Sequence, residues 1–250
     1  MDSSPRHIEL VGPPGAGKTT LAKILADEQG RFTRNTGYET ALKRLLFPRW
    51  FWNSTSYLPG IVARGLARVT QLDPHRRAPL TKELENYQSV SQDILTSYTQ
   101  DTDRQKHVTT TISYLATEYI TICKYIGDDE IVFYDEGFLQ RAVSLFCPPS
   151  PTTEVTKEHV TQYTSAIPKP DAVIIIDITP KIAEARMRNR KSGYPASFQG
   201  FSSEEMIGNL ERTNHLLSIL EDEISTIPTI RIKNEARIDE SVKNIRNLIE

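Results

Sequence analysis

Four short apolar runs along the chain have the length of β-strands that are buried on both faces of a sheet. These runs are residues 7–12, 131–135, 172–177 and 228–232. Continuous apolar stretches of this kind are typical of parallel strands that helices cover on both sides. Residues 31–34 (RFTR) form a weaker candidate for a further strand. The pattern therefore predicts a parallel sheet.

Apolar residues at helical spacing separate these strands. Residues 18–29 carry leucine and alanine on one face, and two further amphipathic segments, 203–224 and 238–249, close the chain. Strands that alternate with helices in this way predict a doubly wound α/β fold, in which helices cover both faces of the sheet and make three layers.

The long segment 38–127 interrupts this alternation, because no strand in it is convincing. Its apolar residues recur at helical spacing in three stripes. The stripes are Ile61, Val62, Gly65, Leu66 and Val69; Leu80, Leu84, Tyr87, Ile94, Leu95 and Tyr98; and Val108, Ile112, Leu115, Tyr119, Ile122 and Ile126. We therefore expect two parts: a core formed by residues 1–37 and 128–250, and a helical insertion at 38–127.

The composition argues against several classes of protein. The chain has 250 residues and a formal net charge of -2, so it has no overall field that would attract a nucleic acid polymer or an anionic membrane. Its 2 cysteines form no CxxC pair, and its 5 histidines lack the spacing of a zinc site. No apolar run approaches the roughly 20 residues that span a bilayer. We expect a soluble, cytoplasmic protein without a membrane span.

The most specific motif is GPPGAGKTT at residues 12–20, which follows a predicted strand, precedes a predicted helix and matches G-x-x-x-x-G-K-[ST]. Small residues allow successive backbone N–H groups to surround phosphate oxygens at a helix N-terminus. Lys18 adds positive charge for the β- and γ-phosphates, and the Thr19 hydroxyl is a candidate magnesium ligand. The predicted nucleotide-binding residues are Gly12, Pro13, Pro14, Gly15, Ala16, Gly17, Lys18, Thr19 and Thr20.

Two acids, Asp135 and Glu136, end the strand 131–135, and Arg141 follows in the next helix. In phosphate-binding-loop proteins an acid at such a strand end holds magnesium through water, a role that Asp135 can fill. Glu136 would then polarise a water or an acceptor hydroxyl, and Arg141 would reach the acceptor or its phosphate. The alternatives are that the acids cap the helix 138–146 and that Arg141 is a solvated surface residue.

A cluster of arginines follows the strand 172–177. Arg186 and Arg190 lie four positions apart on one helical face, and Arg188 lies on another. We interpret the three as a mobile lid that closes over the transferring phosphoryl group. The alternative is an ordinary surface helix, in which Glu184 pairs with these arginines.

Together these motifs resemble the P-loop small-molecule kinases, in particular nucleoside monophosphate kinases and their thymidylate-kinase-like branch. The resemblance covers about residues 1–37 and 128–250. It implies a five-stranded parallel core, ATP and Mg²⁺ as the donor, an acceptor site under the helical insertion, and an arginine lid. It also implies that the loop after the last strand, with Asn234, lies against the adenine. Glu136 stands where thymidylate kinases usually have arginine, and the insertion is longer than a simple monophosphate site needs.

Two functions remain open from the sequence. The first is an ATP- and magnesium-dependent kinase that acts on a small-molecule acceptor, with nucleotides and nucleosides among the candidates. The second is a P-loop ATPase or nucleotide switch whose helical insertion binds a protein. Arginines beside aromatic residues in the insertion, such as Arg44 and Arg49, would either hold a substrate or belong to the core and surface. The mobile arginines favour the kinase. The identity of the acceptor and the oligomeric state are left open.

Overall fold

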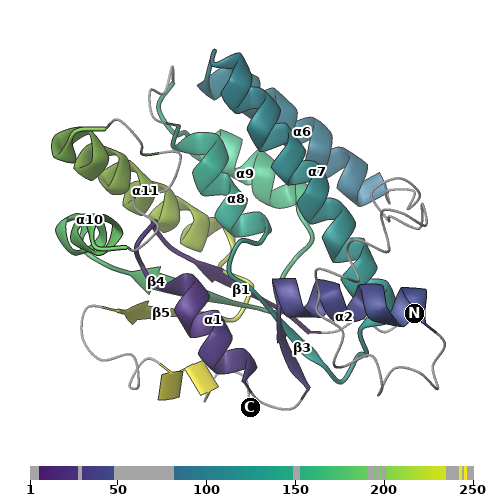
Figure 1. Cartoon of the computed structure of the whole chain (residues 1–250). Coiled ribbons are helices and arrows are strands. Elements are labelled where there is room, and N and C mark those ends of the chain that lie inside the picture. The colour runs from purple at the N-terminus through teal and green to yellow at the C-terminus, as the bar shows by residue number, and fades with distance from the viewer. Residues whose placement is uncertain are drawn as a thin grey trace.

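The computed structural model describes residues 6–27, 30–47, 82–148, 153–190, 194, 198, 201–234, 242–243 and 245–246. Its centre is a 5-stranded parallel sheet in the order β2-β3-β1-β4-β5 (Figure 1). The strands are β1 (Arg6–Val11), β2 (Arg31–Thr33), β3 (Ile131–Tyr134), β4 (Ala172–Asp177) and β5 (Thr229–Lys233). All the predicted strands are present, including the weak candidate at 31–34.

Helices connect the strands and pack on the sheet. They are α1 (Lys18–Ala26), α2 (Arg34–Leu46), α6 (Lys82–Tyr98), α7 (Thr102–Tyr125), α8 (Phe138–Phe146), α9 (Lys157–Ala166), α10 (Pro180–Arg188) and α11 (Ser203–Glu223). Figure 1 shows α1 on one side of the sheet and α6 to α9 on the other. The arrangement is the predicted three-layer α/β fold.

Alternate residues of the inner strands point to opposite faces of the sheet, and both faces are buried. On one face Val173 and Ile175 of β4 pack in a core that they share with α6, α7, α8 and α9. On the other face Ile174 and Ile176 pack with residues of α1 and α10. Because neither face meets water, the strand reads as a continuous apolar run rather than an alternating one.

The described part of the segment 38–127 is helical. The members of the second stripe from Leu84 to Tyr98 are buried, and the third stripe is buried along α7 apart from the partly buried Tyr119. The first stripe, at 61–69, and Leu80 lie outside the described residues. Helix α7 packs against α2, α6 and α8. The limits of the insertion as a separate part of the chain stay a prediction.

The end of the chain is described only at 242–243 and 245–246, which are helical and lie within the predicted helix 238–249. Val242 and Ile245 are buried in the same core as α1. Of the helices that the structure describes, none combines the length and the apolar character needed to cross a membrane.

Candidate functional site

The predicted phosphate-binding loop joins β1 to α1, and its glycines determine its backbone shape. Gly15 (φ 87°) and Gly17 (φ 92°) lie in the left-handed region, which residues with a Cβ rarely adopt. A Cβ on Gly15 would also lie 2.6 Å from the carbonyl oxygen of Ala183 in α10. Gly17 is the N-cap of α1 and gives its first turn no side-chain hydrogen bond. The N–H groups of this turn are therefore available to an anion.

Lys18 begins α1 and is buried beneath the loop. Its Nζ donates hydrogen bonds to the carbonyl oxygens of Gly12, at 2.8 Å, and Pro13, at 3.2 Å. Burial lowers the pKa of Lys18 below its ordinary value, whereas the nearby charges of Glu136 and Asp135 act to raise it. The ammonium group therefore lies within the electrostatic reach of both acids that the sequence singled out.

A buried acid in β1 caps α8. Glu9 is 0% exposed, and its Oε1 and Oε2 accept hydrogen bonds from the backbone N–H groups of Phe138, at 2.9 Å, and Leu139, at 2.7 Å. Negative charge is stabilising at a helix N-terminus. The Nε2 of His7 lies 3.0 Å from Glu9 Oε1 but lacks hydrogen-bond geometry. Sequence reasoning missed Glu9, which looks like one polar residue within an apolar strand.

The Glu9 carboxylate also explains the glycine that follows the two acids. Gly137 is the N-cap of α8, and a Cβ on it would lie 2.5 Å from the Cδ of Glu9. The alternative that Asp135 or Glu136 caps this helix is therefore wrong, because the described contacts give that role to Glu9. Helix capping therefore does not account for Asp135 and Glu136, and their predicted roles in metal binding and proton transfer remain predictions.

Gln140 joins the same helix to the phosphate-binding loop. Its Oε1 accepts a hydrogen bond of 3.0 Å from the backbone N–H of Gly12, and its side chain is buried. Helix α8 is thus attached to β1 through Glu9 and to the loop through Gln140. The positions of the acids before α8 and of Arg141 within it are consequently fixed relative to the loop.

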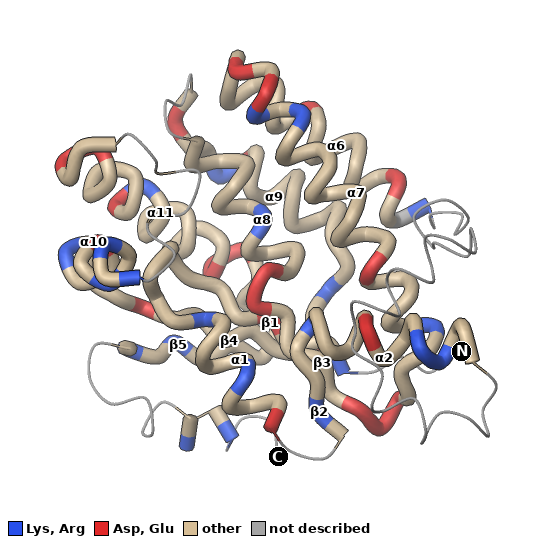
Figure 2. The backbone as a smooth tube through the Cα atoms, in the orientation of Figure 1, with Lys and Arg blue, Asp and Glu red and all other residues tan. Residues whose placement is uncertain are grey.

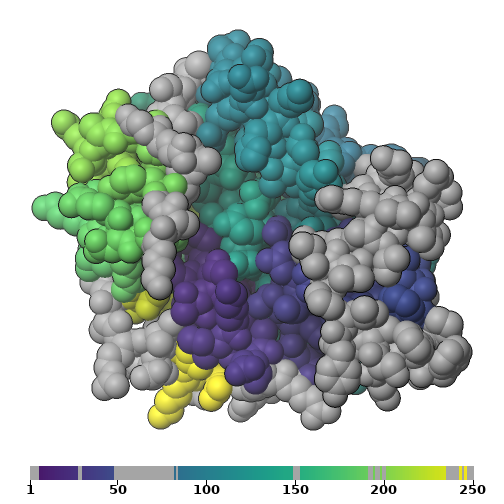
Figure 3. Space-filling model, in the orientation of Figure 1, coloured from purple at the N-terminus to yellow at the C-terminus, as the bar shows by residue number. Residues whose placement is uncertain are grey.

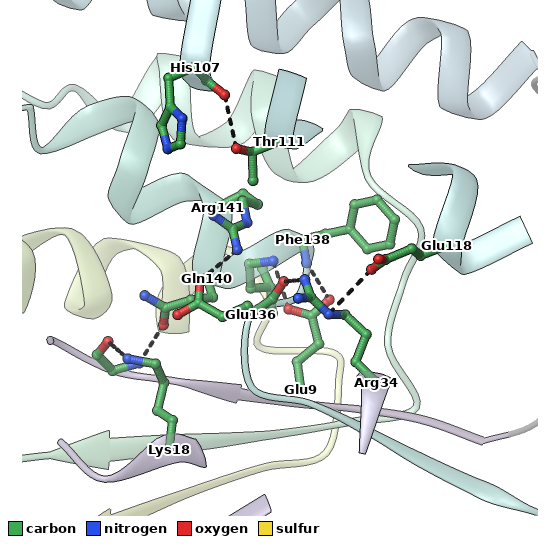
Figure 4. Close-up of polar contacts among 12 residues, drawn as sticks. Glu9, Lys18, Arg34, His107, Thr111, Glu118, Glu136, Phe138, Gln140 and Arg141 are labelled. Atoms are coloured by element: carbon green, nitrogen blue, oxygen red, sulfur yellow. Dashed lines mark hydrogen bonds and ion pairs between the residues drawn. The ribbon is translucent and has the colours of Figure 1, made fainter. Parts of the chain in front are cut away.

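Glu136 and Arg141 form an ion pair at the start of α8, with 2.6 Å between Arg141 Nη2 and Glu136 Oε2. The Glu136 side chain is 41% exposed, so one side of the carboxylate faces solvent. Arg34, the first residue of α2, donates a hydrogen bond of 3.0 Å to the carbonyl oxygen of Glu136 and pairs with Glu118 of α7. Asp135 is buried directly after β3. Figure 4 shows Glu136 and Arg141 between Lys18 and His107.

The three arginines of the predicted lid differ in their surroundings. Arg188 forms an ion pair with Glu184 one turn earlier in α10, and the Tyr194 hydroxyl donates to the same carboxylate at 3.2 Å. Arg186 is half-buried on α10. Arg190 follows the end of α10 and lines the cleft beside the loop, where its charge lowers the pKa of Lys18. The surface-helix alternative therefore holds for Arg188, whereas Arg190 reaches the site. Figure 2 shows the basic residues gathered on α10.

Asn234 lies next to the phosphate-binding loop. Its Nδ2 donates a hydrogen bond of 2.7 Å to the carbonyl oxygen of Ala16, and its backbone N–H donates to the carbonyl of Asp177. The side chain is buried and would meet a Cβ on Gly17 at 2.7 Å. Asn234 thus supports the loop from the end of β5. The expected contact with adenine stays a prediction.

A cleft of about 410 Å³ connects these groups. Residues of the loop and of the first turn of α1, including Lys18, Thr19 and Thr20, line one end. Side chains of α8 and α7 line the remainder, and Arg190, Phe198 and Asn209 also contribute. In Figure 3 the surface is hollowed where the purple N-terminal segment meets the teal helices. A volume of this size suits a small organic molecule.

Two basic residues of α7, Arg104 and His107, also line the cleft, and the sequence reasoning missed both. The sequence did contain a signal for Arg104. This residue lies four positions before Val108, so it occupies a place in the apolar stripe of α7 where a hydrophobic residue would be expected. By contrast, Arg44 pairs with Glu130 at 2.9 Å and donates to the carbonyl of Tyr125, so it ties α2 to the segment before β3. Arg49 lies outside the described residues.

Comparisons with known proteins agree with this fold. Residues 8–64 match the family described as "ATPase family associated with various cellular activities (AAA)". A solved structure of deoxyadenosine kinase from M. mycoides, with the products dCMP and a flexible dCDP bound, has a TM-score of 0.52 and 13% sequence identity, and the match covers 97% of both chains. Structures described as that enzyme with dCTP and with dATP match with TM-scores of 0.47 and 12% identity, again over 97% of both chains. No curated protein sequence matches the chain.

The chain therefore has an α/β fold similar to that of this solved deoxyadenosine kinase, with a phosphate-binding-loop motif between β1 and α1. At 13% identity the likeness establishes the fold and leaves the substrate to be inferred from the site.

Proposed function

We propose that this protein transfers the γ-phosphate of ATP to a hydroxyl group of a small molecule. The observation that carries the proposal is a single cleft in which Lys18, Thr19 and Thr20 of the loop face Glu136, Arg141 and Arg190. A donor site, a carboxylate and cationic side chains within one cavity are the parts that phosphoryl transfer requires. The deoxyadenosine kinase with a similar fold makes nucleosides and nucleotides the first acceptors to test.

The donor half of the reaction is assigned to the loop. Backbone N–H groups of 15–20 would bind the phosphate oxygens, and Lys18 would exchange its bonds to the carbonyls of Gly12 and Pro13 for the β- and γ-phosphates. Thr19 and Asp135 would hold Mg²⁺, Asp135 through water. The described residues contain no cluster of three or more acidic, histidine or cysteine ligands. A cation held by two protein groups, phosphates and water fits the coordination habits of Mg²⁺. The metal would neutralise charge on the transferring group.

The acceptor half is assigned to Glu136 and Arg141, and Arg190 is assigned to the phosphoryl group in transfer. Glu136 lines the cleft with a half-exposed side chain, and its ion pair with Arg141 would orient the carboxylate to accept the proton of the attacking hydroxyl. Arg190 would place positive charge beside the equatorial oxygens of the phosphoryl group during transfer. Arg188, which is held by Glu184, takes no direct part. The cytoplasm is the proposed compartment, since it supplies ATP and keeps the thiols of Cys123 and Cys147 reduced.

The match of residues 8–64 to an ATPase family favours a second candidate, a nucleotide hydrolase or switch that binds a protein partner. The two are separated by measuring ADP release from Mg·ATP in the presence of a panel of nucleosides, nucleotides, sugars and hydroxy acids. A kinase releases ADP at a rate that depends on the acceptor. Slow release that no acceptor changes, but that a protein stimulates, would support the switch instead.

A further inference from the structure

The end of the cleft away from the phosphate-binding loop carries positive charge that the proposed transfer step does not use. Arg104 and His107 lie one turn apart on α7 and line this end, together with Val143 and Ser144 of α8 and Cys147 directly after it. Figure 4 shows His107 on the far side of Arg141 from Lys18. This pair of side chains is here named the α7 basic pair.

Arg104 is a cation without an ion-pair partner among the described residues. Its Nη2 donates a hydrogen bond of 2.9 Å to the carbonyl of Ser144, and its buried Nε has no partner in the described structure. The acid Asp101 lies three positions earlier, and its Oδ1 accepts hydrogen bonds from the backbone N–H groups of Asp103 and Arg104. Burial is the main reason that the pKa of Arg104 is lowered. The charge is therefore partly desolvated and only weakly compensated.

The position of Arg104 in the helix gives no stabilising reason for its charge. Arg104 lies in the first turn of α7, where the helix macrodipole disfavours positive charge. Other cations of the cleft differ. Arg141 is neutralised by Glu136, and Lys18 and Arg190 lie at the donor end. Arg104 is a partly desolvated cation at an unfavourable helix position, and it faces a cavity. A bound anion would compensate its charge, so we expect it to bind one.

We propose that the acceptor carries an anionic group, a phosphate or a carboxylate, which the α7 basic pair binds. The inference rests on the proposed function, because it describes the acceptor of that reaction. Gln140, at the loop, and Ser144, at Arg104, are four residues apart in α8, or about 6 Å along the helix axis. The acceptor must therefore present a hydroxyl near Glu136 and its anion farther along α8, near Arg104.

The test is calorimetric titration of the whole chain saturated with Mg²⁺ and a non-hydrolysable ATP analogue, so that the donor phosphates already occupy the loop. The probes are matched pairs: thymidine and thymidine monophosphate, glucose and glucose 6-phosphate, glycerol and glycerate. We expect the anionic member of at least one pair to bind 10-fold or more tightly, about the effect of one charge-assisted hydrogen bond. The pairs that respond distinguish phosphate from carboxylate.

Arg104→Gln should reduce this preference about 10-fold, while the affinity for the ATP analogue stays unchanged. Lys106→Gln is the matched control, since Lys106 is exposed on the same helix outside the cleft lining. Equal binding of both members of every pair, no binding of any probe, or equal effects of the two substitutions would overturn the proposal. A separate outcome tests the proposed function. If an anionic probe binds through Arg104 but receives no phosphate from ATP, the kinase activity is contradicted and the anion-binding site is still supported.

Discussion

The cap that Glu9 provides for α8 makes a quantitative prediction. Glu9→Gln keeps the shape of the side chain and one acceptor oxygen, but it turns an NH₂ group toward the backbone N–H of Phe138 or Leu139. One hydrogen bond to a charged group is lost, at about 1.5–3 kcal/mol. The favourable interaction with the helix N-terminus is also lost, up to about 2 kcal/mol, and relief of the buried charge offsets part of the total. We expect a net loss of about 2–3 kcal/mol.

For a chain of this size such a loss lowers Tm by about 5–10 °C. Urea unfolding followed by circular dichroism measures the free energy of unfolding, and thermal unfolding measures Tm. Glu211→Gln is the control, because Glu211 is exposed on α11 and its substitution should stay within about 0.5 kcal/mol of the parent. If Glu9→Gln unfolds at the same urea concentration as the control, the carboxylate is not a stabilising cap and the reasoning is refuted.

Further predictions concern the same helix and the basic residues of the cleft. Gly137→Ala should destabilise the fold by about 1–3 kcal/mol in the same unfolding assay, because its Cβ would overlap the Glu9 carboxylate; unchanged stability would contradict that close approach. Glu136→Gln should preserve affinity for the ATP analogue and lower kcat at least about 100-fold, and a kcat near that of the parent would remove Glu136 from the reaction. Arg190→Ala should lower kcat by about 100-fold or more, whereas Arg188→Ala should change it less than about 3-fold. Equal effects of the two arginine substitutions on kcat would show that Arg190 does not stabilise the transferring phosphoryl group.

The parts of the site that lie close together in the sequence could be predicted from it. The phosphate-binding loop is one continuous segment whose glycines, lysine and flanking elements all appear within residues 7–29, so its pattern was sufficient. The buried strands were equally visible, because β4 is apolar at every position that both sheet faces bury. Local signals of this kind need no knowledge of the tertiary structure.

Contacts between distant segments could not be read in the same way. Glu9 and Phe138 are 129 positions apart, and Gly12 and Gln140 are 128 apart. Only the parallel pairing of β1 with β3 brings their ends together. The capping alternative therefore considered only the acids nearest in sequence, whereas the cap comes from Glu9 of β1. The arginines of the predicted lid show a second difficulty, because the sequence did not reveal which of them would face the cleft. That depends on where α10 ends: Arg188 lies in the helix and pairs with Glu184, whereas Arg190 lies beyond its last residue.

The central claim is that the γ-phosphate of ATP is transferred to a small molecule in the cleft, and the most direct measurement follows where that phosphate goes. The chain is incubated with Mg²⁺ and γ-³²P-labelled ATP together with the acceptor panel, and the labelled products are separated. We predict that the label appears on an organic acceptor, and that Lys18→Ala removes most of this transfer while its unfolding curve stays that of the parent. Label that appears only as inorganic phosphate, with every acceptor present, would contradict the account.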